Sequence, residues 1–437
     1  MYVTMIGAGY VGLVSGACFS EFGVGASCVD KEERYIERLN RGIIPIYEPG
    51  LEAIVRSNVE KGRLEFTSDL ASAVKRADIV FIAVGTPSRR GNGYADLSFV
   101  HEAAREIAGA LSGYTVVVNK STVPVGTARS IKQIIGDENP EAEFDIASNP
   151  EFLREGSAIN DFMRPDRVVI GVDSERAAQL LRELYRPLYL IETPMVITDL
   201  ETAELIKYAS NAFLATKISF INEISNLCER CGANVQDVAK GMGLDRRIGP
   251  KFLHAGPGFG GSCLPKDVRA LVKMFHDRGL PARIAEAVLQ VNSAQGSWMV
   301  QKLREALGGT EYGKTIAFLG LTFKPETNDM RDAPSLFIIP ALLEGGALVR
   351  AADPKGVDEA KKLMERVEYF DDPYIACDGA DAVVIMTEWN EYRALDLGML
   401  KERMKGTSFI DLRNVYKPEE VTRRGFSYTG VGIQTRR

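Results

Sequence analysis

Three glycines near the start of the chain form the first candidate binding site. Gly7, Gly9 and Gly12 make a G-x-G-x-x-G motif, with Tyr10 and Val11 before the last glycine. The first glycine of such a motif permits a tight turn, the second lets a pyrophosphate approach the backbone, and the third lets a helix pack closely on a strand. The spacing therefore predicts a dinucleotide site at the N-terminus of a helix.

An acidic residue indicates which dinucleotide binds there. Asp30 follows at the expected spacing of roughly 20 residues, at the predicted end of the second strand. A carboxylate at this position accepts hydrogen bonds from the adenosine ribose and repels the additional phosphate of NADP, which favours NAD. Arg34 could instead attract that phosphate, so NADP remains an alternative.

A second glycine-rich segment, residues 256–267, carries a cysteine suited to covalent chemistry. Cys263 precedes Pro265, which is typical of the first turn of a helix, and lies near the cation of Lys266. A helix N-terminus and a cation both stabilise a thiolate, which can add to an aldehyde. Loss of hydride then gives a thioester, and its hydrolysis gives an acid. Many cysteines are simply small buried residues, but the neighbouring glycines indicate close approach of a ligand, so we interpret Cys263 as a nucleophile.

Polar residues on a long predicted helix form a third group. Lys207 and Asn211 are four residues apart and therefore project from one face, and Glu204 lies one turn earlier. A buried lysine with a lowered pKa could take part in acid–base chemistry. A solvated polar stripe explains the same spacing, and the sequence alone leaves both interpretations open.

Loops after later strands carry further polar residues. Thr122, Glu151 and Glu155 lie in two such loops, and Lys324 and Arg413 follow strands in the last part of the chain. Ligands of open α/β sheets bind beyond the carboxyl ends of the strands, where carboxylates can orient a water and cations suit phosphate oxygens. Helix caps and surface salt bridges are the competing explanations.

The elements that must position these groups alternate between short β-rich runs and helical stretches. This rhythm predicts a Rossmann-like doubly wound parallel sheet in residues 1–198 and a second, smaller one in residues 301–437. Residues 199–231 form one helical stretch without proline, within a central region, 199–300, that joins the two domains and carries the cysteine loop. The predicted fold class is α/β, with two parallel-sheet domains joined by a long central helix. The predicted strands are residues 2–6, 26–30, 78–84, 115–120, 144–148, 167–172, 315–319, 349–353, 382–387 and 408–411.

Composition and charge exclude several function classes. The 437 residues include 53 Lys and Arg and 59 Asp and Glu, so the net charge of −6 offers no basic field for nucleic acid or an anionic membrane. The sequence has neither a basic leader nor an apolar stretch long enough to cross a bilayer, so we expect a cytoplasmic location. The three histidines and six cysteines lack the spacing of metal ligands, so no metal site is expected. Cys228 and Cys231 end the long helix, where we expect a structural role.

Together these segments resemble the nucleotide-sugar dehydrogenases of the UDP-glucose/GDP-mannose dehydrogenase family, over nearly the whole chain. The motifs that carry the resemblance are GAGYVG (7–12), YEPGL (47–51), GTP (85–87), STVPVGT (121–127), NPEFLREG (149–156) and GFGGSCLPKD (258–267). The segment RRIG (246–249) resembles the UDP-glucose branch. GDP-mannose and UDP-N-acetylmannosamine dehydrogenases share the same framework, so these substrates are the alternative.

The resemblance implies two successive NAD-dependent oxidations of the C6 alcohol of UDP-glucose to the carboxylate, with Cys263 as covalent nucleophile, in a homodimer or higher homo-oligomer. It implies that Lys207 stabilises oxyanions, that Asn211 and Asp267 position water, and that Thr122, Glu151 and Glu155 arrange the water network and base catalysis. The implied cofactor contacts are Gly7, Gly9, Tyr10, Val11, Gly12, Asp30, Arg34, Thr86, Thr122, Glu155 and Arg331. The implied substrate contacts are Phe152, Leu153, Glu155, Lys207, Asn211, Phe252, Gly260, Lys324, Arg413 and, across a dimer interface, Arg247.

Two other function classes remain open at this point. A two-electron hydroxyacid dehydrogenase would share the first domain and the long helix, but it would leave the cysteine loop and the last domain without a role. The yield of NADH per substrate separates these two classes. A non-catalytic NAD sensor or scaffold would need only residues 7–30, and absence of turnover would favour it.

Overall fold

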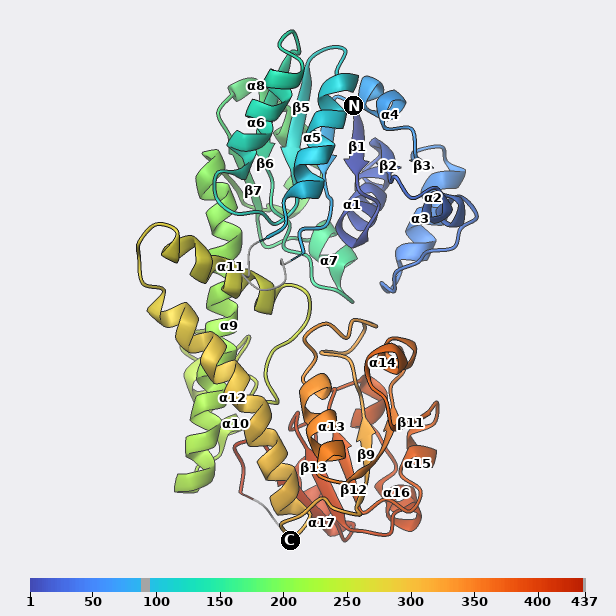
Figure 1. Ribbon diagram of the computed structural model, residues 1–437, viewed down its shortest axis with the longest axis vertical. Helices are drawn as coiled ribbons and strands as arrows, with labels where there is room; N and C mark the ends of the chain where they lie inside the picture. The colour runs from blue at the N-terminus through green and yellow to red at the C-terminus, as the bar shows by residue number, and fades with distance from the viewer. Residues whose placement is uncertain (88–94, 435–437) are drawn as a thin grey trace. The chain divides into compact units, whose positions relative to one another are not determined.

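Two sheets organise the chain, one in each of two α/β units (Figure 1). The computed structural model describes residues 1–87 and 95–434. Unit 1 is Met1–Ser210 and unit 2 is Asn211–Arg437. The long helix α9 (Leu200–Cys231) begins in unit 1 and continues in unit 2, so the predicted central helix is confirmed.

The sheet of unit 1 has eight strands in the order β3-β2-β1-β4-β5-β6-β7-β8. The first six follow the strand order of dinucleotide-binding sheets, in which the order reverses between β1 and β4. These six pair in parallel, which confirms the predicted Rossmann-like sheet, whereas β7 runs antiparallel to β6 and carries β8 at the edge. The strands are β1 (Tyr2–Ile6), β2 (Gly25–Val29), β3 (Leu64–Thr67), β4 (Ile79–Ile82), β5 (Thr115–Asn119), β6 (Phe144–Ser148), β7 (Val168–Val172) and β8 (Met195–Thr198).

Helices cover both faces of this sheet, and alternate strand residues point into opposite layers. In β4, Ile79 and Phe81 pack in one core with α1 and α7, whereas Val80 and Ile82 pack in a second core with α4, α5 and α6. A strand buried on both faces is apolar throughout, as the sequence Ile-Val-Phe-Ile of β4 is. The helices are α1 (Tyr10–Glu21), α2 (Glu33–Asn40), α3 (Leu51–Glu60), α4 (Leu70–Arg76), α5 (Ser98–Ala110), α6 (Thr127–Glu138), α7 (Ala158–Met163), α8 (Glu175–Leu184) and the 3-10 helix η1 (Arg186–Ile191).

The sheet of unit 2 repeats the strand order of the first six strands of unit 1. Its order is β11-β10-β9-β12-β13-β14, and its strands pair in parallel. A glycine with positive φ follows the first strand of each sheet, Gly7 at 99° and Gly320 at 92°. The two halves are therefore built on the same plan. The strands are β9 (Thr315–Leu319), β10 (Leu348–Ala352), β11 (Val367–Phe370), β12 (Ala382–Ile385), β13 (Ser408–Asp411) and β14 (Ser427–Gly430).

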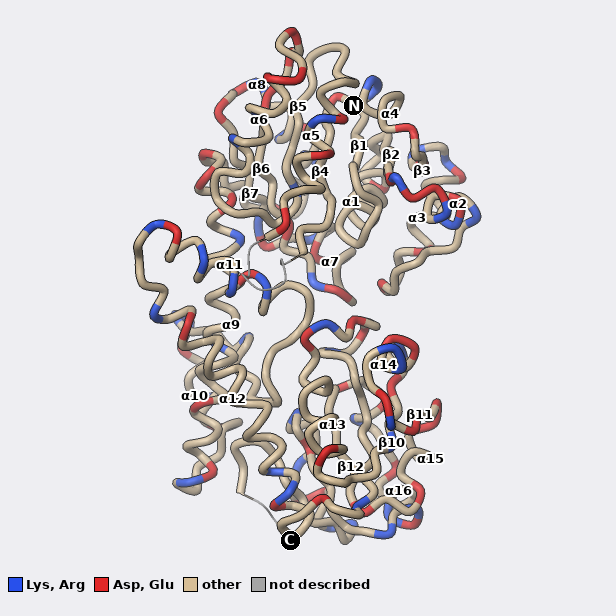
Figure 2. Tube along the Cα trace, viewed as in Figure 1, with Lys and Arg blue, Asp and Glu red and all other residues tan. Residues whose placement is uncertain are grey.

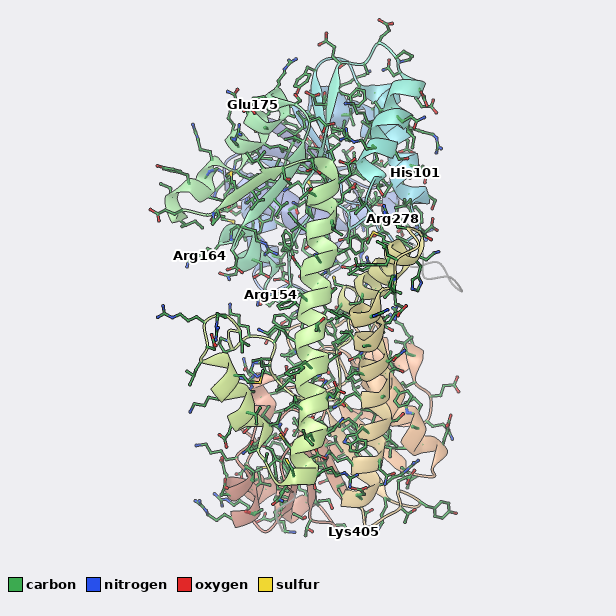
Figure 3. The ribbon with its side chains drawn as sticks, turned by 90° about the vertical axis from the view of Figure 1, so that its left-hand side faces the viewer. His101, Arg154, Arg164, Glu175, Arg278 and Lys405 are labelled. Carbon is green, nitrogen blue, oxygen red and sulfur yellow. The ribbon has the colours of Figure 1, made fainter. Side chains whose placement is uncertain are left out.

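Two long helices lie side by side and run parallel in unit 2, the second part of α9 and α12 (Figures 1 and 3). The Ser219 hydroxyl donates to the carbonyl of Val288 at 3.1 Å, and Lys302 pairs with Glu229 at 2.7 Å. The helices of unit 2 after α9 are α10 (Val235–Gly243), α11 (Leu264–His276), α12 (Arg283–Ala306), α13 (Ser335–Glu344), α14 (Val357–Leu363), α15 (Pro373–Ala376), α16 (Leu397–Arg403), α17 (Pro418–Arg423) and the 3-10 helix η2 (Asn390–Arg393).

Both units carry basic and acidic residues among the described parts of the chain. Figure 2 shows basic and acidic positions interspersed along the trace of each unit. In the part of the chain that the structure describes, no helix has the length and apolar character needed to span a bilayer.

The acidic residue after the second strand has a different role in each sheet. Asp30, after β2, accepts hydrogen bonds from the backbone N–H groups of Ala8 and Glu32, both at 3.1 Å. Asp353, after β10, is 6% exposed. It accepts from two backbone N–H groups of the loop after β9, from two of its own turn, and from the indole of Trp389. Its lone pairs are therefore used inside the protein.

We predict that Asp353→Asn destabilises unit 2 far more than Asp30→Asn destabilises unit 1. An amide at position 353 turns an NH2 group toward N–H donors, and leaving such buried groups unpaired costs roughly 2–4 kcal/mol of unfolding free energy. The same change at Asp30, which has fewer donors, should cost less than about 1 kcal/mol. Urea unfolding followed by circular dichroism measures the unfolding free energy of both variants. Equal losses would contradict the structural role assigned to Asp353.

Candidate active site

The glycine turn after β1 has one face that packs inside unit 1 and one that is open. A Cβ on Gly7 would lie 2.7 Å from the carbonyl oxygen of Ala83, and one on Gly12 would lie 1.8 Å from that of Gly7. A Cβ on Gly9, the residue before α1, would meet nothing within 4 Å. The first turn of α1 also has no side-chain cap. The turn thus leaves helix N–H groups and an open glycine available for a pyrophosphate, so these residues fit a dinucleotide.

Residues of neighbouring loops surround this turn at the carboxyl edge of the sheet. Asp30 is half-buried, whereas Arg34 on α2 is exposed. Thr86 is buried, and its hydroxyl donates to the carbonyl of Thr122 at 2.9 Å, which joins the loops after β4 and β5. The structure therefore brings the predicted cofactor residues of unit 1 to one edge of the sheet.

A buried ion pair lies beyond β6. Lys207 Nζ is 3.1 Å from Glu151 Oε1 and donates to the Glu151 carbonyl at 2.7 Å. Their side chains are only 4% and 7% exposed, which excludes the solvated stripe as an explanation of Lys207. The ring of Phe152 lies 5.2 Å from the same Nζ, and the guanidinium carbon of Arg167 lies 3.4 Å from the ring centroid. The pair is thus held in a largely desolvated setting, where a charge acts strongly on a bound ligand.

A second buried lysine, Lys120, lies next to this pair, and no role was predicted for its side chain. Lys120 Nζ donates to Asn149 Oδ1 at 2.9 Å and to the hydroxyl of Tyr185 at 3.3 Å. Burial lowers the pKa of Lys120 to about 8, with Glu151 acting in the opposite direction and Lys207 reinforcing the decrease. Because Asn149 begins the loop that carries Glu151, Lys120 anchors that loop. The available signal was a lysine that directly follows an apolar strand.

Glu204, one turn before Lys207, is also buried. Its carboxylate accepts the N–H groups of Gly126 at 2.6 Å and Ala128 at 2.7 Å, at the start of α6. Burial raises the pKa of Glu204 to about 7, although these two N–H groups oppose the rise. Glu204 therefore caps α6 and connects α9 to the end of the loop that carries Thr122.

The loop after β6 is held by its own carboxylates. Glu151 Oε2 accepts the N–H of Leu153 at 2.5 Å. Arg154, labelled in Figure 3, pairs with Asp161 at 2.5 Å. Glu155 is half-buried and close enough to Tyr10 that its charge helps to raise the pKa of that phenol, after burial and Glu48. Glu155 is thus near the first residue of α1.

In unit 2, Cys263 immediately precedes α11, as predicted from Pro265 in the first turn. Its Sγ lies 3.5 Å from the hydroxyl oxygen of Ser262. Asp267, one turn into the helix, is 1% exposed and accepts hydrogen bonds from Asn211 Nδ2 and Lys266 Nζ, both at 2.6 Å. The structure therefore joins Asn211 to Asp267. The cation of Lys266, near Cys263, is paired with the same carboxylate.

The glycines of the cysteine loop are explained by packing within unit 2. A Cβ on Gly260 would lie 2.2 Å from the carbonyl oxygen of Asp332. One on Gly261, which has a φ of 84°, would lie 2.7 Å from the ring of Phe323. Contacts with protein atoms therefore already require glycine at these two positions, and close approach of a ligand to this loop stays a prediction. The role of Cys263 as a nucleophile also stays a prediction.

The basic residues of unit 2 lie in loops beyond its strands. Arg413 donates to the carbonyls of Met386 at 2.8 Å and Phe323 at 3.0 Å, next to the half-buried Lys324. Arg331 is exposed and pairs with Asp329 at 2.8 Å, and its carbonyl accepts the N–H of Gly261. These loops and the cysteine loop therefore meet at one edge of the second sheet.

Two further predicted substrate residues of unit 2 are Arg247 and Phe252. The Arg247 side chain is 89% exposed and pairs with Asp245 at 2.6 Å. Phe252 is half-buried, with a φ of 65°. Residues 1–87 and 95–434 contain no group of three or more His, Cys, Asp or Glu side chains that could hold a metal ion.

Comparison with known proteins places this geometry in a family. Residues 1–189, 201–294 and 317–418 match the NAD binding, central and UDP binding domains of the UDP-glucose/GDP-mannose dehydrogenase family. The chain is 58% identical to UDP-glucose 6-dehydrogenase of Rhizobium meliloti, over 99% of both chains. It resembles the structure of a UDP-glucose dehydrogenase from Pyrobaculum islandicum with a TM-score of 0.91 and 40% identity, covering 99% of this chain and 98% of that one. It also resembles the structure of a UDP-D-ManNAc dehydrogenase from Pyrococcus horikoshii, with a TM-score of 0.86 and 27% identity over 99% of both chains. NAD is therefore the cofactor, as predicted from Asp30.

We predict that alanine at Gly9 and at Gly12 has opposite effects on stability and NAD binding. Gly9→Ala adds a methyl group to the open face, so it should weaken NAD binding by roughly tenfold or more and shift the unfolding midpoint little. Gly12→Ala forces α1 away from the turn and should lower the unfolding free energy by about 2 kcal/mol or more. Calorimetric titration measures the NAD affinity of the two variants, and urea unfolding measures their stability. Wild-type NAD affinity in Gly9→Ala would show that the pyrophosphate lies elsewhere.

Proposed function

The chain belongs to the UDP-glucose/GDP-mannose dehydrogenase family, and on this premise we propose that it oxidises the C6 alcohol of UDP-glucose to the carboxylate with two NAD. The observation that carries this proposal is the 58% identity, over 99% of both chains, to a protein named UDP-glucose 6-dehydrogenase. Identity to the UDP-D-ManNAc dehydrogenase structure is only 27%. UDP-N-acetylmannosamine and GDP-mannose are therefore the less supported substrates.

A division into three parts follows from this proposal. Residues 1–198 bind NAD, residues 199–300 carry the cysteine loop, and residues 301–437 bind the nucleotide sugar. The NAD part is supported by the open glycine turn and the half-buried Asp30. The nucleotide-sugar part is supported by Lys324 and Arg413, whose cations suit phosphate oxygens.

The first oxidation converts the C6 alcohol to an aldehyde. NAD, when bound, supplies the hydride acceptor for both oxidations. As the hydroxyl loses its proton, negative charge develops on the C6 oxygen, and we assign its stabilisation to the buried ammonium of Lys207. Glu151, 3.1 Å from that ammonium, and Glu155 are the candidate bases, and Thr122 helps to order the water.

The second oxidation passes through a covalent adduct on the protein. The Cys263 thiolate adds to the aldehyde carbon, which forms a C–S bond and, after protonation of the oxygen, a thiohemiacetal. Loss of the proton from the hydroxyl group of this adduct and of hydride from its carbon leaves a thioester. Water then adds to the carbonyl carbon, the C–S bond breaks, and the thiolate leaves as the acid is released. Asn211 and Asp267, hydrogen-bonded to each other at 2.6 Å, are the groups we assign to positioning this water.

A homodimer and a cytoplasmic location complete the proposal. Phe213, Phe220 and Leu227 recur every seven residues on α9 and are 66%, 45% and 60% exposed, which suits a second copy of the chain. The Arg247 side chain is exposed in the single chain, which agrees with a role in the site of a partner subunit. A reducing compartment would keep Cys263 as a thiol.

The experiment that tests the proposed function is NADH production across a panel of nucleotide sugars. We expect two NADH for each UDP-glucose consumed, because the alcohol is oxidised by four electrons in total. One NADH per substrate would indicate a hydroxyacid-type dehydrogenase, and no turnover would indicate a sensor or scaffold. A kcat/KM with GDP-mannose or UDP-N-acetylmannosamine equal to that with UDP-glucose would contradict the assigned substrate.

We further predict that Cys263→Ser nearly abolishes steady-state NADH production. A serine hydroxyl is a weaker nucleophile, and an oxygen ester is hydrolysed less readily than a thioester, so both halves of the second oxidation should suffer. A covalent sugar adduct should then accumulate, and intact-protein mass spectrometry detects it. Cys231→Ser is the matched control: this exposed residue at the end of α9 should tolerate the change with kcat near wild type. Normal turnover by Cys263→Ser would remove the covalent step from the mechanism.

A further inference from the structure

The motif at residues 47–51 has no role in the reaction described so far. It lies in the loop between α2 and α3, and its acidic residue, Glu48, is only 6% exposed. A buried carboxylate is unfavourable unless hydrogen-bond donors compensate for the lost water. The donors that surround Glu48 therefore indicate why the chain keeps a charge there.

Three donors surround the Glu48 carboxylate, and they come from two distant segments. Oε2 accepts the hydroxyl of Tyr10 in a short hydrogen bond and the N–H of Gly156 at 2.6 Å. Oε1 accepts the N–H of Ala158 at 2.8 Å. Hydrogen bonds from N–H and O–H groups to a carboxylate are among the strong ones in proteins. Both oxygens are thus engaged.

The two segments are parts of the proposed site of unit 1. Tyr10 is the first residue of α1 and directly follows Gly9, the open glycine of the turn. Gly156 directly follows Glu155, and Ala158 is the first residue of α7. One carboxylate therefore holds the start of the dinucleotide helix against the loop that carries Glu155.

The Tyr10 hydroxyl also interacts with the backbone of Gly156, and apolar contacts between these segments lie further along the helices. Phe19 on α1 and Phe162 on α7 pack edge to face, with ring centroids 4.9 Å apart. The motif itself packs on α7, since a Cβ on Gly50 would lie 3.7 Å from Ile159 Cδ1. Apolar packing fixes the distance between the helices, whereas the directional hydrogen bonds of Glu48 fix how their first residues face each other.

We propose that Glu48 is a positioning residue that couples dinucleotide binding at the glycine turn to the placement of Glu155. This inference rests on the proposed function for the part played by Glu155, but its effect on NAD binding does not require turnover. The hydrogen bond to Glu48 fixes the orientation of Tyr10, the first residue after the open glycine. The same carboxylate fixes the backbone on which Glu155 is carried.

The test compares Glu48→Gln with wild type in NAD binding and in kinetics. The glutamine amide has one acceptor oxygen, and its NH2 group faces N–H donors, so the link between α1 and the Glu155 loop should break. We expect the Kd for NAD to rise roughly tenfold and kcat to fall roughly tenfold, as misplaced reacting groups do, while the KM for UDP-glucose stays within about twofold. In combination with Tyr10→Phe, the loss of NAD affinity should be much less than additive, because both changes break the same hydrogen bond.

A purely structural role for Glu48 gives a different pattern. Val55→Ala removes apolar packing from the same core, where Val55 is 2% exposed, and it is the matched control for lost stability. It should lower the unfolding temperature and leave the Kd for NAD within about twofold of wild type. An equal loss of NAD affinity in Val55→Ala would overturn the proposal, and so would wild-type Kd and kcat in a folded Glu48→Gln protein.

Two outcomes of this test require an additional measurement. If Glu48→Gln does not fold, Glu48→Asp keeps the charge but withdraws it by one methylene, and it should show the same separation of NAD affinity from the KM for UDP-glucose. If wild type binds NAD but does not oxidise UDP-glucose, the proposed function fails. Calorimetric titration of the same variants with NAD still decides whether Glu48 supports NAD binding at the glycine turn.

Discussion

Parallel strands deliver their carboxyl ends to one edge of a sheet, and the placement of the candidate functional groups depends on this constraint. In unit 1 it brings together the glycine turn after β1, Asp30 after β2, Thr122 after β5 and Glu151 after β6. Unit 2 uses the same constraint to bring Lys324 and Arg413 to the edge where its cysteine loop packs. The groups are distant in sequence and become neighbours only because the strands run in one direction.

The edge of the first sheet is supported by ionisable groups that are largely removed from water. Lys120, Glu151, Glu204 and Lys207 are all buried. Each is compensated locally: the lysines by amide, phenol and carboxylate oxygens, and the carboxylates by N–H groups or an ammonium. Such groups are poor sources of stability, since apolar residues would fill the same space at lower cost. Their value lies in fixing loops and in presenting charge where little solvent screens it.

Local pattern predicted the interior strands and missed the outer ones. The four strands absent from the prediction, β3, β8, β11 and β14, are the four edges of the two sheets. Each has four residues and mixes polar with apolar side chains, so its structure comes from its neighbour and not from its own periodicity. Their short runs resemble loops when read alone.

The candidate site divides in the same way. Motifs whose residues are close in sequence, such as Gly7 to Gly12 and Cys263 to Asp267, were found directly. The supporting groups were not, because their partners are remote: Glu48 and Ala158 are 110 residues apart, and Glu204 and Gly126 are 78 apart. Spacing also could not reveal that Gly260 packs closely against the backbone of Asp332.

The common strand order places an acid at the same position of both sheets, directly after the second strand. In unit 1 this acid, Asp30, keeps a partly open carboxylate. In unit 2 Asp353 instead fastens two loops to each other. A carboxylate can serve a ligand only with lone pairs that the protein leaves unused, so a ribose could reach Asp353 only after those loops were released.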